Sequence, residues 1–118
     1  RWYKRLAYDM AFGGIAHESE EGERISRAVG NHGAVMMQNH GVTTFGATVA
    51  EAWDALYHLE RAAKTLVLAY STGQPLALMA DDLAEETAEG WEVYKEAEFA
   101  HFNEMKRILD REEPDYKD

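Results

Sequence analysis

A stretch of regularly spaced apolar side chains between Thr48 and Tyr70 is the strongest structural signal in the sequence. Its members recur at three- and four-residue steps, the spacing of one face of an α-helix. They are Val49, Trp53, Leu56, Tyr57, Leu59, Ala63, Leu66, Val67 and Tyr70. Thr48 and Glu51 have the spacing of a capping box, and Gly73 and Pro75 follow as stop signals. The sequence therefore predicts one long helix with an apolar face to bury.

Two short apolar runs before this helix predict β-strands. Ala34–Met37 lies between two Asn-His-Gly triplets, and residues 42–45 are closed by Gly46. Apolar or β-branched runs of this length between turn residues are typical of buried or half-buried strands. Upstream, the acidic residues after Ser19 predict a helix that ends before Gly30.

A second capping pattern, Asp82 to Glu85, predicts another helix in the last third of the chain. Its spaced members are Ala84, Thr87, Trp91, Tyr94, Phe102, Met105 and Ile108. Gly90 predicts a bend, and residues 112–118 are expected to form a solvated tail. Strands followed by covering helices indicate a mixed α/β fold.

Charge is distributed unevenly, and it disfavours a nucleic-acid partner. The 118 residues include 22 acidic and 12 basic side chains, for a net charge of −10. Residues 1–76 carry 8 acids and 7 bases, whereas residues 77–118 carry 14 acids and 5 bases. Phosphate-backbone binding needs a basic surface that this composition lacks. The acids of the last third are expected to form a solvated helix face.

Cysteine usage and hydropathy point to a soluble, cytoplasmic protein. The absence of Cys excludes a disulfide framework, a thiolate metal site and a cysteine nucleophile. No run approaches the roughly 18 apolar residues of a membrane span, so no membrane partner is expected. The chain opens at Arg1, without Met or a helix cap, and is expected to be a fragment.

The five histidines are the candidates for metal binding or near-neutral acid–base chemistry. His32 and His40 each lie in an Asn-His-Gly triplet, where the Gly allows a tight turn. An exposed turn residue is the favoured interpretation of each, but His40 is better placed because it lies between two predicted strands. One imidazole does not make a zinc site, so the remaining ligands must come from elsewhere.

The other three histidines have simpler interpretations. His58 follows Asp54 by four residues, which predicts a surface pair on the long helix. His101 lies beside the aromatic stripe and is expected to pack or to contact a partner, and His17 is expected to be exposed. The residues alone therefore indicate an acidic α/β chain with one suggestive histidine.

Ordered segments along nearly the whole chain resemble a known family. They are Tyr8-Asp9, Phe12-Gly13-Gly14-Ile15-Ala16, Glu21-Gly22-Glu23-Arg24-Ile25, Gln38-Asn39-His40-Gly41-Val42, Gly46-Ala47-Thr48-Val49-Ala50-Glu51-Ala52, Leu59-Glu60-Arg61-Ala62 and the acidic close at 109–116. In this order they resemble the C-terminal half of the class II aldolase/adducin family. The combination is more specific than any one triplet.

The resemblance implies a fold and a metal site. Residues 1–118 would be the C-terminal part of a single domain with a three-layer α/β/α fold, contributing two or more strands and about three helices. The family holds a divalent metal, usually zinc, with an upstream His-x-His pair and a third histidine that His40 matches. No His-x-His occurs in this chain, and the upstream acid–base glutamate and phosphate loop of the family are also missing.

The resemblance also implies an activity. A class II aldolase-type lyase cleaves a hydroxy-carbonyl or sugar-phosphate-like small molecule by retro-aldol chemistry, through a metal-stabilised enolate. Homotetramers with active sites near subunit interfaces are implied as well. Alternatives are a non-catalytic adducin-like scaffold, or a decarboxylase or oxygenase that uses Mn or Fe. Tyr8 and Tyr70 match positions at the site edge, although packing is the favoured role for both.

Overall fold

The computed structural model describes residues 1–12 and 19–117, with only the backbone of Ser19 and Lys95. Three strands, four α-helices and two 3₁₀ turns lie in these residues. In chain order they are β1 (Leu6–Asp9), α1 (Ser19–Val29), β2 (Ala34–Met37), β3 (Gly41–Thr44), α2 (Val49–Ser71), α3 (Asp81–Gly90), η1 (Trp91–Tyr94), α4 (Lys95–Glu112) and η2 (Pro114–Lys117).

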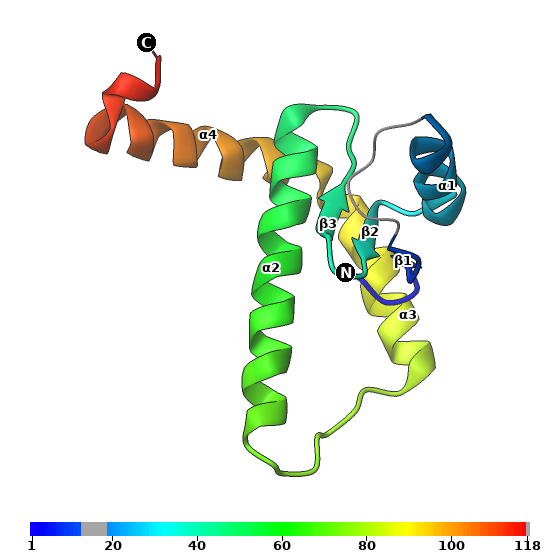
Figure 1. The fold of residues 1–118 in the computed structure, drawn as a ribbon. Helices are drawn as coiled ribbons and strands as arrows, with labels where there is room; N and C mark the ends of the chain where they lie inside the picture. The colour runs from blue at the N-terminus through cyan, green and yellow to red at the C-terminus, as the bar shows by residue number, and fades with distance from the viewer. Residues whose placement is uncertain (13–18, 118) are drawn as a thin grey trace.

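The three strands form one mixed sheet in the order β1-β2-β3. β1 runs parallel to β2, with Leu6 opposite Ala34, and β3 runs antiparallel to β2, with Thr44 opposite Ala34. Helix α1 connects the parallel pair and packs against β1 and β2, whereas α2 packs against β3. Figure 1 shows the sheet between these two helices. The predicted α/β class and both predicted strands are confirmed, and β1 is an additional strand. The predicted burial holds for β2 but is wrong for β3, which is exposed except at Thr44.

A tight turn between β2 and β3 carries the second Asn-His-Gly triplet. Asn39 and Gly41 both have positive φ angles, 56° and 140°, and the His40 N–H donates to the Met37 carbonyl at 3.2 Å. Asn tolerates the left-handed region and Gly enters it without steric cost. The triplet therefore reverses the chain and presents His40 at the tip of the turn.

Thr48 caps α2 as predicted, but the Glu51 carboxylate binds the N–H of Ala47 in place of the Thr48 N–H that a capping box would use. The Thr48 hydroxyl accepts a hydrogen bond from the Glu51 N–H at 3.2 Å, and the Glu51 carboxylate accepts one from the Ala47 N–H at 2.7 Å. Gly46 is required just before the cap, because a Cβ there would lie 2.6 Å from the Glu51 Cβ and 2.7 Å from the Ala52 nitrogen. The loop can therefore approach the first turn of α2 closely.

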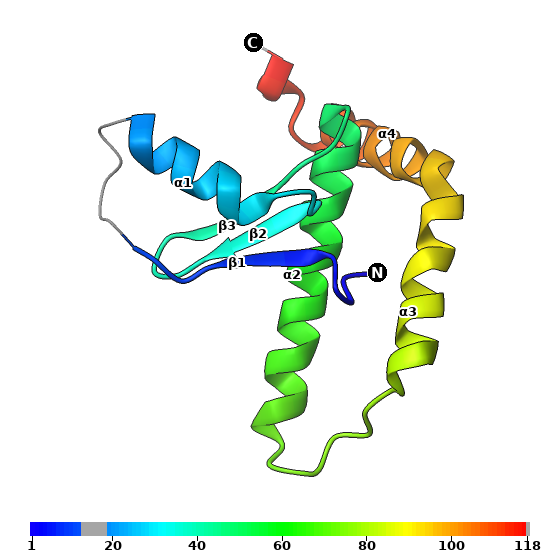
Figure 2. The same ribbon diagram turned by 90° about the vertical axis from the view of Figure 1, so that its right-hand side faces the viewer.

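Only the first half of α2 is buried. The buried members are Ala50, Asp54, Ala55 and Leu59. Beyond them the predicted apolar face is open: Leu66, Val67 and Tyr70 are 52%, 68% and 65% exposed. Figures 1 and 2 show this end of α2 extending away from the sheet, with a long connection leading back to α3.

The C-terminal region differs in two respects from the sequence prediction. Helix α3 begins at Asp81 after Ala80, which has no capping side chain, so the predicted box opening at Asp82 is wrong. The predicted bend at Gly90 is confirmed, because η1 separates α3 from α4 there. The expected tail forms η2, in which the Tyr116 hydroxyl donates to Asp110 at 2.6 Å. This exposed segment is thus folded back on α4.

Candidate functional site

The structure separates the histidines into different environments. His17 lies outside the described residues. His32 is exposed, and its Nδ1 lies 2.9 Å from the Val29 carbonyl oxygen, as expected for a turn residue. His40 lies in the β2–β3 turn, whereas His58 and His101 come from α2 and α4 and lie close together. Figure 2 shows that the β2–β3 turn is far from the place where α2 meets α4.

His40 lies at the edge of the sheet where the parallel strands end. Asp9 and Met37, the last residues of β1 and β2, are paired in register, and the turn follows directly. The Gln38 N–H donates to the Asp9 carbonyl at 2.8 Å, which holds the turn beside β1. The exposed imidazole makes an edge-to-face contact with Phe12, with ring centroids 6.5 Å apart. Ligands in open α/β sheets commonly bind at this edge.

A charged network lies next to this turn. The Arg24 guanidinium donates to the buried Asp9 carboxylate and binds Glu21 through two hydrogen bonds, at 2.9 and 2.5 Å. These bonds lower the pKa of Asp9 and the pKa of Glu21 below their ordinary values. The network joins α1 to the end of β1.

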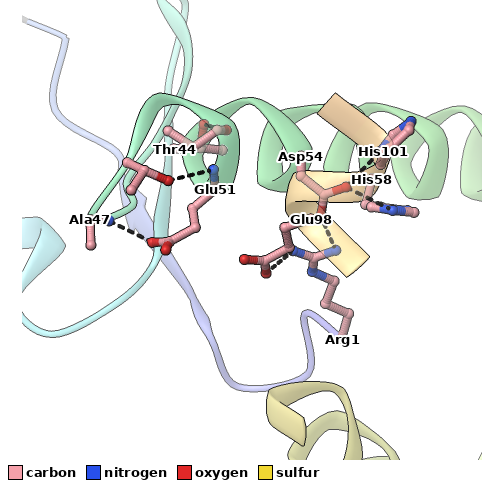
Figure 3. A network of polar contacts seen from close by, with 10 residues as sticks. Arg1, Thr44, Ala47, Glu51, Asp54, His58, Glu98 and His101 are labelled. Atoms are coloured by element: carbon pink, nitrogen blue, oxygen red, sulfur yellow. Dashed lines mark hydrogen bonds and ion pairs between the residues drawn. The ribbon is translucent and has the colours of Figure 1, made fainter. Parts of the chain in front are cut away.

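A second polar cluster lies between α2 and α4, centred on Asp54. His101 Nδ1 lies 2.7 Å from Asp54 Oδ1, and His58 Nε2 lies 3.5 Å from the same oxygen. Arg1 donates to the other carboxylate oxygen, Oδ2, at 2.7 Å, and also to Glu98 at 3.3 Å. The Asp54 side chain is only 4% exposed. Figure 3 shows both imidazoles on one side of this carboxylate and Arg1 on the other.

Hydrogen bonds, burial and aromatic packing act together on this cluster. Burial opposes ionisation of Asp54, but hydrogen bonds from His101 and Arg1 outweigh it and lower the pKa of the carboxyl. Burial lowers the pKa of His58, although Asp54 opposes this effect. The His101 ring packs 4.6 Å from the Tyr57 ring, centroid to centroid. A cavity of about 200 Å³ adjoins these side chains.

Asp54, His58 and His101 together form a candidate metal-binding cluster. Each offers one ligand atom, and these atoms all lie within 4.8 Å of one another. The predicted pairing of Asp54 with His58 is present, but the prediction of a surface pair is wrong because the carboxylate is buried. The contribution of His101 was missed, since nothing in the sequence links positions 47 residues apart.

Neither tyrosine that the family resemblance suggested packs in the interior of the described chain. Tyr8 is 63% exposed and Tyr70 is 65% exposed, so a packing role for either would need a surface outside the described residues. Met36 and Met37 are half-buried in β2, as expected for core positions. In the described residues, no helix is long and apolar enough to cross a membrane.

Comparison with known proteins identifies the family of this chain. A family model described as "Class II Aldolase and Adducin N-terminal domain" matches residues 4–67, more than half of the chain. This chain belongs to that family, as the sequence resemblance predicted. The matched region contains all three strands, α1, the His40 turn and most of α2.

Individual relatives agree with this assignment. A Caulobacter vibrioides protein named "Putative aldolase class 2 protein" is 36% identical over 121 residues, covering 97% of this chain and 45% of that protein. A Pseudomonas aeruginosa protein of the same description is 32% identical over 66 residues, covering 56% of this chain and 26% of the relative. The chain therefore spans less than half the length of these relatives.

A solved structure shows the same fold. The crystal structure of an aldolase II superfamily protein from Pseudomonas syringae superposes with a TM-score of 0.83 at 28% identity. The match covers 99% of this chain and 47% of that one. The predicted class II aldolase-like fold is thereby confirmed.

Proposed function

We propose that the protein is a metal-dependent lyase that cleaves a small hydroxy-carbonyl or sugar-phosphate-like substrate by a retro-aldol reaction, with His40 as one metal ligand. The observation that supports it is the placement of His40. In a chain of the class II aldolase family, this imidazole is exposed at the tip of a rigid turn, at the sheet edge where β1 and β2 end. Residues 1–118 would form the C-terminal part of one such domain.

The residues around His40 fit one ligand of a metal site. Imidazole binds zinc, iron and manganese, of which zinc is our first choice for this protein and Mn or Fe the alternatives. A catalytic zinc usually has three protein ligands. Within the described residues, the cluster with three ligand groups lies elsewhere, around Asp54. The proposal therefore needs further ligands from residues outside those described.

The roles of the surrounding side chains follow from their contacts. When bound, a divalent metal would polarise a substrate oxygen and stabilise the negative charge that develops as a carbon–carbon bond breaks. His40 would bind that ion with its exposed imidazole. Phe12 restricts rotation of the ring by its edge contact, and the Asp9–Arg24 pair fixes the strand end beside the turn. These residues would hold the ligand in place before substrate binds.

Replacement of His40 tests this proposal. In the purified protein, His40→Ala is expected to abolish turnover in a retro-aldol assay against hydroxy-carbonyl compounds and sugar phosphates, and to lower the bound metal by one equivalent. His32→Ala is the matched control, because it changes an exposed histidine in the other Asn-His-Gly triplet. Unchanged metal content and turnover in His40→Ala would exclude His40 as a ligand.

The same measurements separate the alternatives. If replacing His40 removes no bound metal, the result would support a non-catalytic adducin-like scaffold, the second function that the family description suggests. Iron or manganese in place of zinc, together with decarboxylase or oxygenase activity, would support a redox or decarboxylating relative.

We further propose a cytoplasmic homotetramer. The lack of Cys supports the compartment, and the exposed apolar face of α2 supports assembly.

A further inference from the structure

We propose that Asp54, His58 and His101 form a second metal site, separate from His40, which binds a zinc-like divalent ion and ties α4 to α2. The proposal does not depend on the lyase activity, because the β2–β3 turn that carries His40 lies away from the place where α2 meets α4 (Figure 2). It depends on the types, distances and surroundings of three side chains. Figure 3 shows them converging from the two helices.

The ligand types suit a transition metal. Two imidazoles and one carboxylate are a donor set found in catalytic zinc sites. His58 follows Asp54 by four residues on α2, so both side chains project from the same helix face. His101 reaches them from α4 and supplies the third ligand. Three protein ligands leave a fourth coordination position for water.

Each imidazole lies at a distance from Asp54 that is near the ligand spacing around an ion, and all three ligand atoms lie within 4.8 Å of one another. Ligand atoms about 2.0–2.1 Å from a tetrahedral zinc are separated by roughly 3.3 Å. His58 Nε2 and Asp54 Oδ1 are 3.5 Å apart, which already matches this spacing. His101 Nδ1 and the same oxygen are 2.7 Å apart, a hydrogen-bond distance. This contact would lengthen by roughly 0.6 Å when the ion replaces the shared proton.

The charge around the cluster is compatible with a cation. Arg1 occupies Asp54 Oδ2 and leaves Oδ1 directed at the two imidazoles. The guanidinium also pairs with Glu98, so one positive charge is accompanied by two carboxylates. Asp54 is already ionised in these contacts, so its buried carboxylate can bind a cation without first losing a proton. The adjoining cavity of about 200 Å³ has room for a water ligand.

Such an ion would have a structural consequence. Asp54 and His101 are 47 residues apart in the chain, and α2 and α4 touch along this contact. A metal bridge between them would hold α4 against the body of the protein. Binding to the native state alone would then raise its stability with the logarithm of the metal concentration once that concentration exceeds the dissociation constant.

The test uses Co²⁺ and Zn²⁺ as probes on the purified, chelator-treated protein. We expect Co²⁺ to give a d–d absorption band and Zn²⁺ to displace it. His101→Gln keeps a hydrogen-bond donor for Asp54 but removes the imidazole. Loss of the hydrogen-bond partner of a metal ligand can weaken metal binding by roughly 100-fold. Loss of the ligand itself is therefore expected to weaken Co²⁺ binding by at least as much. His58→Gln should behave in the same way.

Two controls make the outcome decisive. His40→Ala should retain the Co²⁺ band of the Asp54 site, so failure of the proposed lyase site and failure of this site give different results. In His40→Ala protein, which lacks the proposed lyase site, Zn²⁺ should raise the thermal midpoint, and adding His101→Gln should abolish this rise. Circular dichroism checks the helix content of each variant. An unchanged number of bound metal ions in both Gln variants would overturn the proposal. It would also be overturned if the protein bound a single metal ion that was lost both in His101→Gln and in His40→Ala.

Discussion

The buried carboxylate of Asp9 ties the end of β1 to helix α1, beside the turn that carries His40. It is 5% exposed, pairs with Arg24, and accepts a hydrogen bond from the Ala11 N–H at 3.1 Å. Its ionised form is the one stabilised in the folded state, because the hydrogen bond from Arg24 lowers its pKa. The free energy of unfolding that Asp9 contributes should therefore fall as the pH is lowered.

We expect this contribution to be lost at acidic pH. A carboxyl group whose pKa is lowered on folding stabilises the protein above its unfolded pKa of about 4, and the stabilisation disappears as pH falls through the folded value. Asp9→Asn should therefore have a lower thermal midpoint than the wild type at pH 6. The difference should shrink toward pH 2.5. A constant difference across this range would contradict the role of the charge.

At the residue level, the sequence predicted spacing but not burial. The four-residue step from Asp54 to His58 follows from helix geometry, so their pairing was predictable. The burial of Asp54 was not, because it depends on Arg1 and on α4, which lie far from it in the chain. His40 was found through its triplet between two strands. The network around Asp9 gave no sequence signal of comparable strength.

At the level of elements, local chemistry determined what could be predicted. The Thr48 cap, the stop before Gly73 and the strands around His40 depend on neighbouring residues, and all are present. The missed strand, β1, is four residues long and becomes a strand only by pairing with β2. The Asp82 box failed because the same motif can occur within the first turn of a helix that begins without a side-chain cap.

Gly46 provides a test of the close approach between the loop and α2. Gly46→Ala should destabilise the protein by about 1–3 kcal/mol, because the new methyl group would meet the Ala52 backbone nitrogen at 2.7 Å. Gly22→Ala is the matched control: it lies inside α1, where the added methyl meets no atom within 4 Å. The control should be stabilising by about 0.5–1 kcal/mol. Urea unfolding would measure both, and equal effects would refute the steric argument.

At the level of the whole molecule, the described chain is extended and exposes much apolar surface. Its radius of gyration is 17.0 Å, whereas a compact chain of this length would have one of about 13.5 Å. The exposed half of α2 contributes Leu66, Val67 and Tyr70 on one side of the helix. Contiguous apolar patches of this kind mark interaction surfaces. We therefore expect this face of α2 to be covered by another protein surface.

Substitution within this face should weaken assembly. Val67→Asp places a charge where apolar contact is expected, and it should raise the dissociation constant of the oligomer by at least about tenfold. Thr65→Asp is the control, since it adds the same charge two residues away, on the other side of α2. Sedimentation velocity over a concentration series would measure both. A wild type that is monomeric throughout would show that the face has no such partner.

The register of the sheet has a consequence for the order of folding. β2 and β3 are joined by a three-residue turn, whereas Leu6 must find Ala34 across the whole of α1. Closing a short loop has a smaller entropic barrier than forming a non-local pairing, and hairpins form within about 1–10 μs. The hairpin that carries His40 should therefore form early and serve as the template on which β1 is added last.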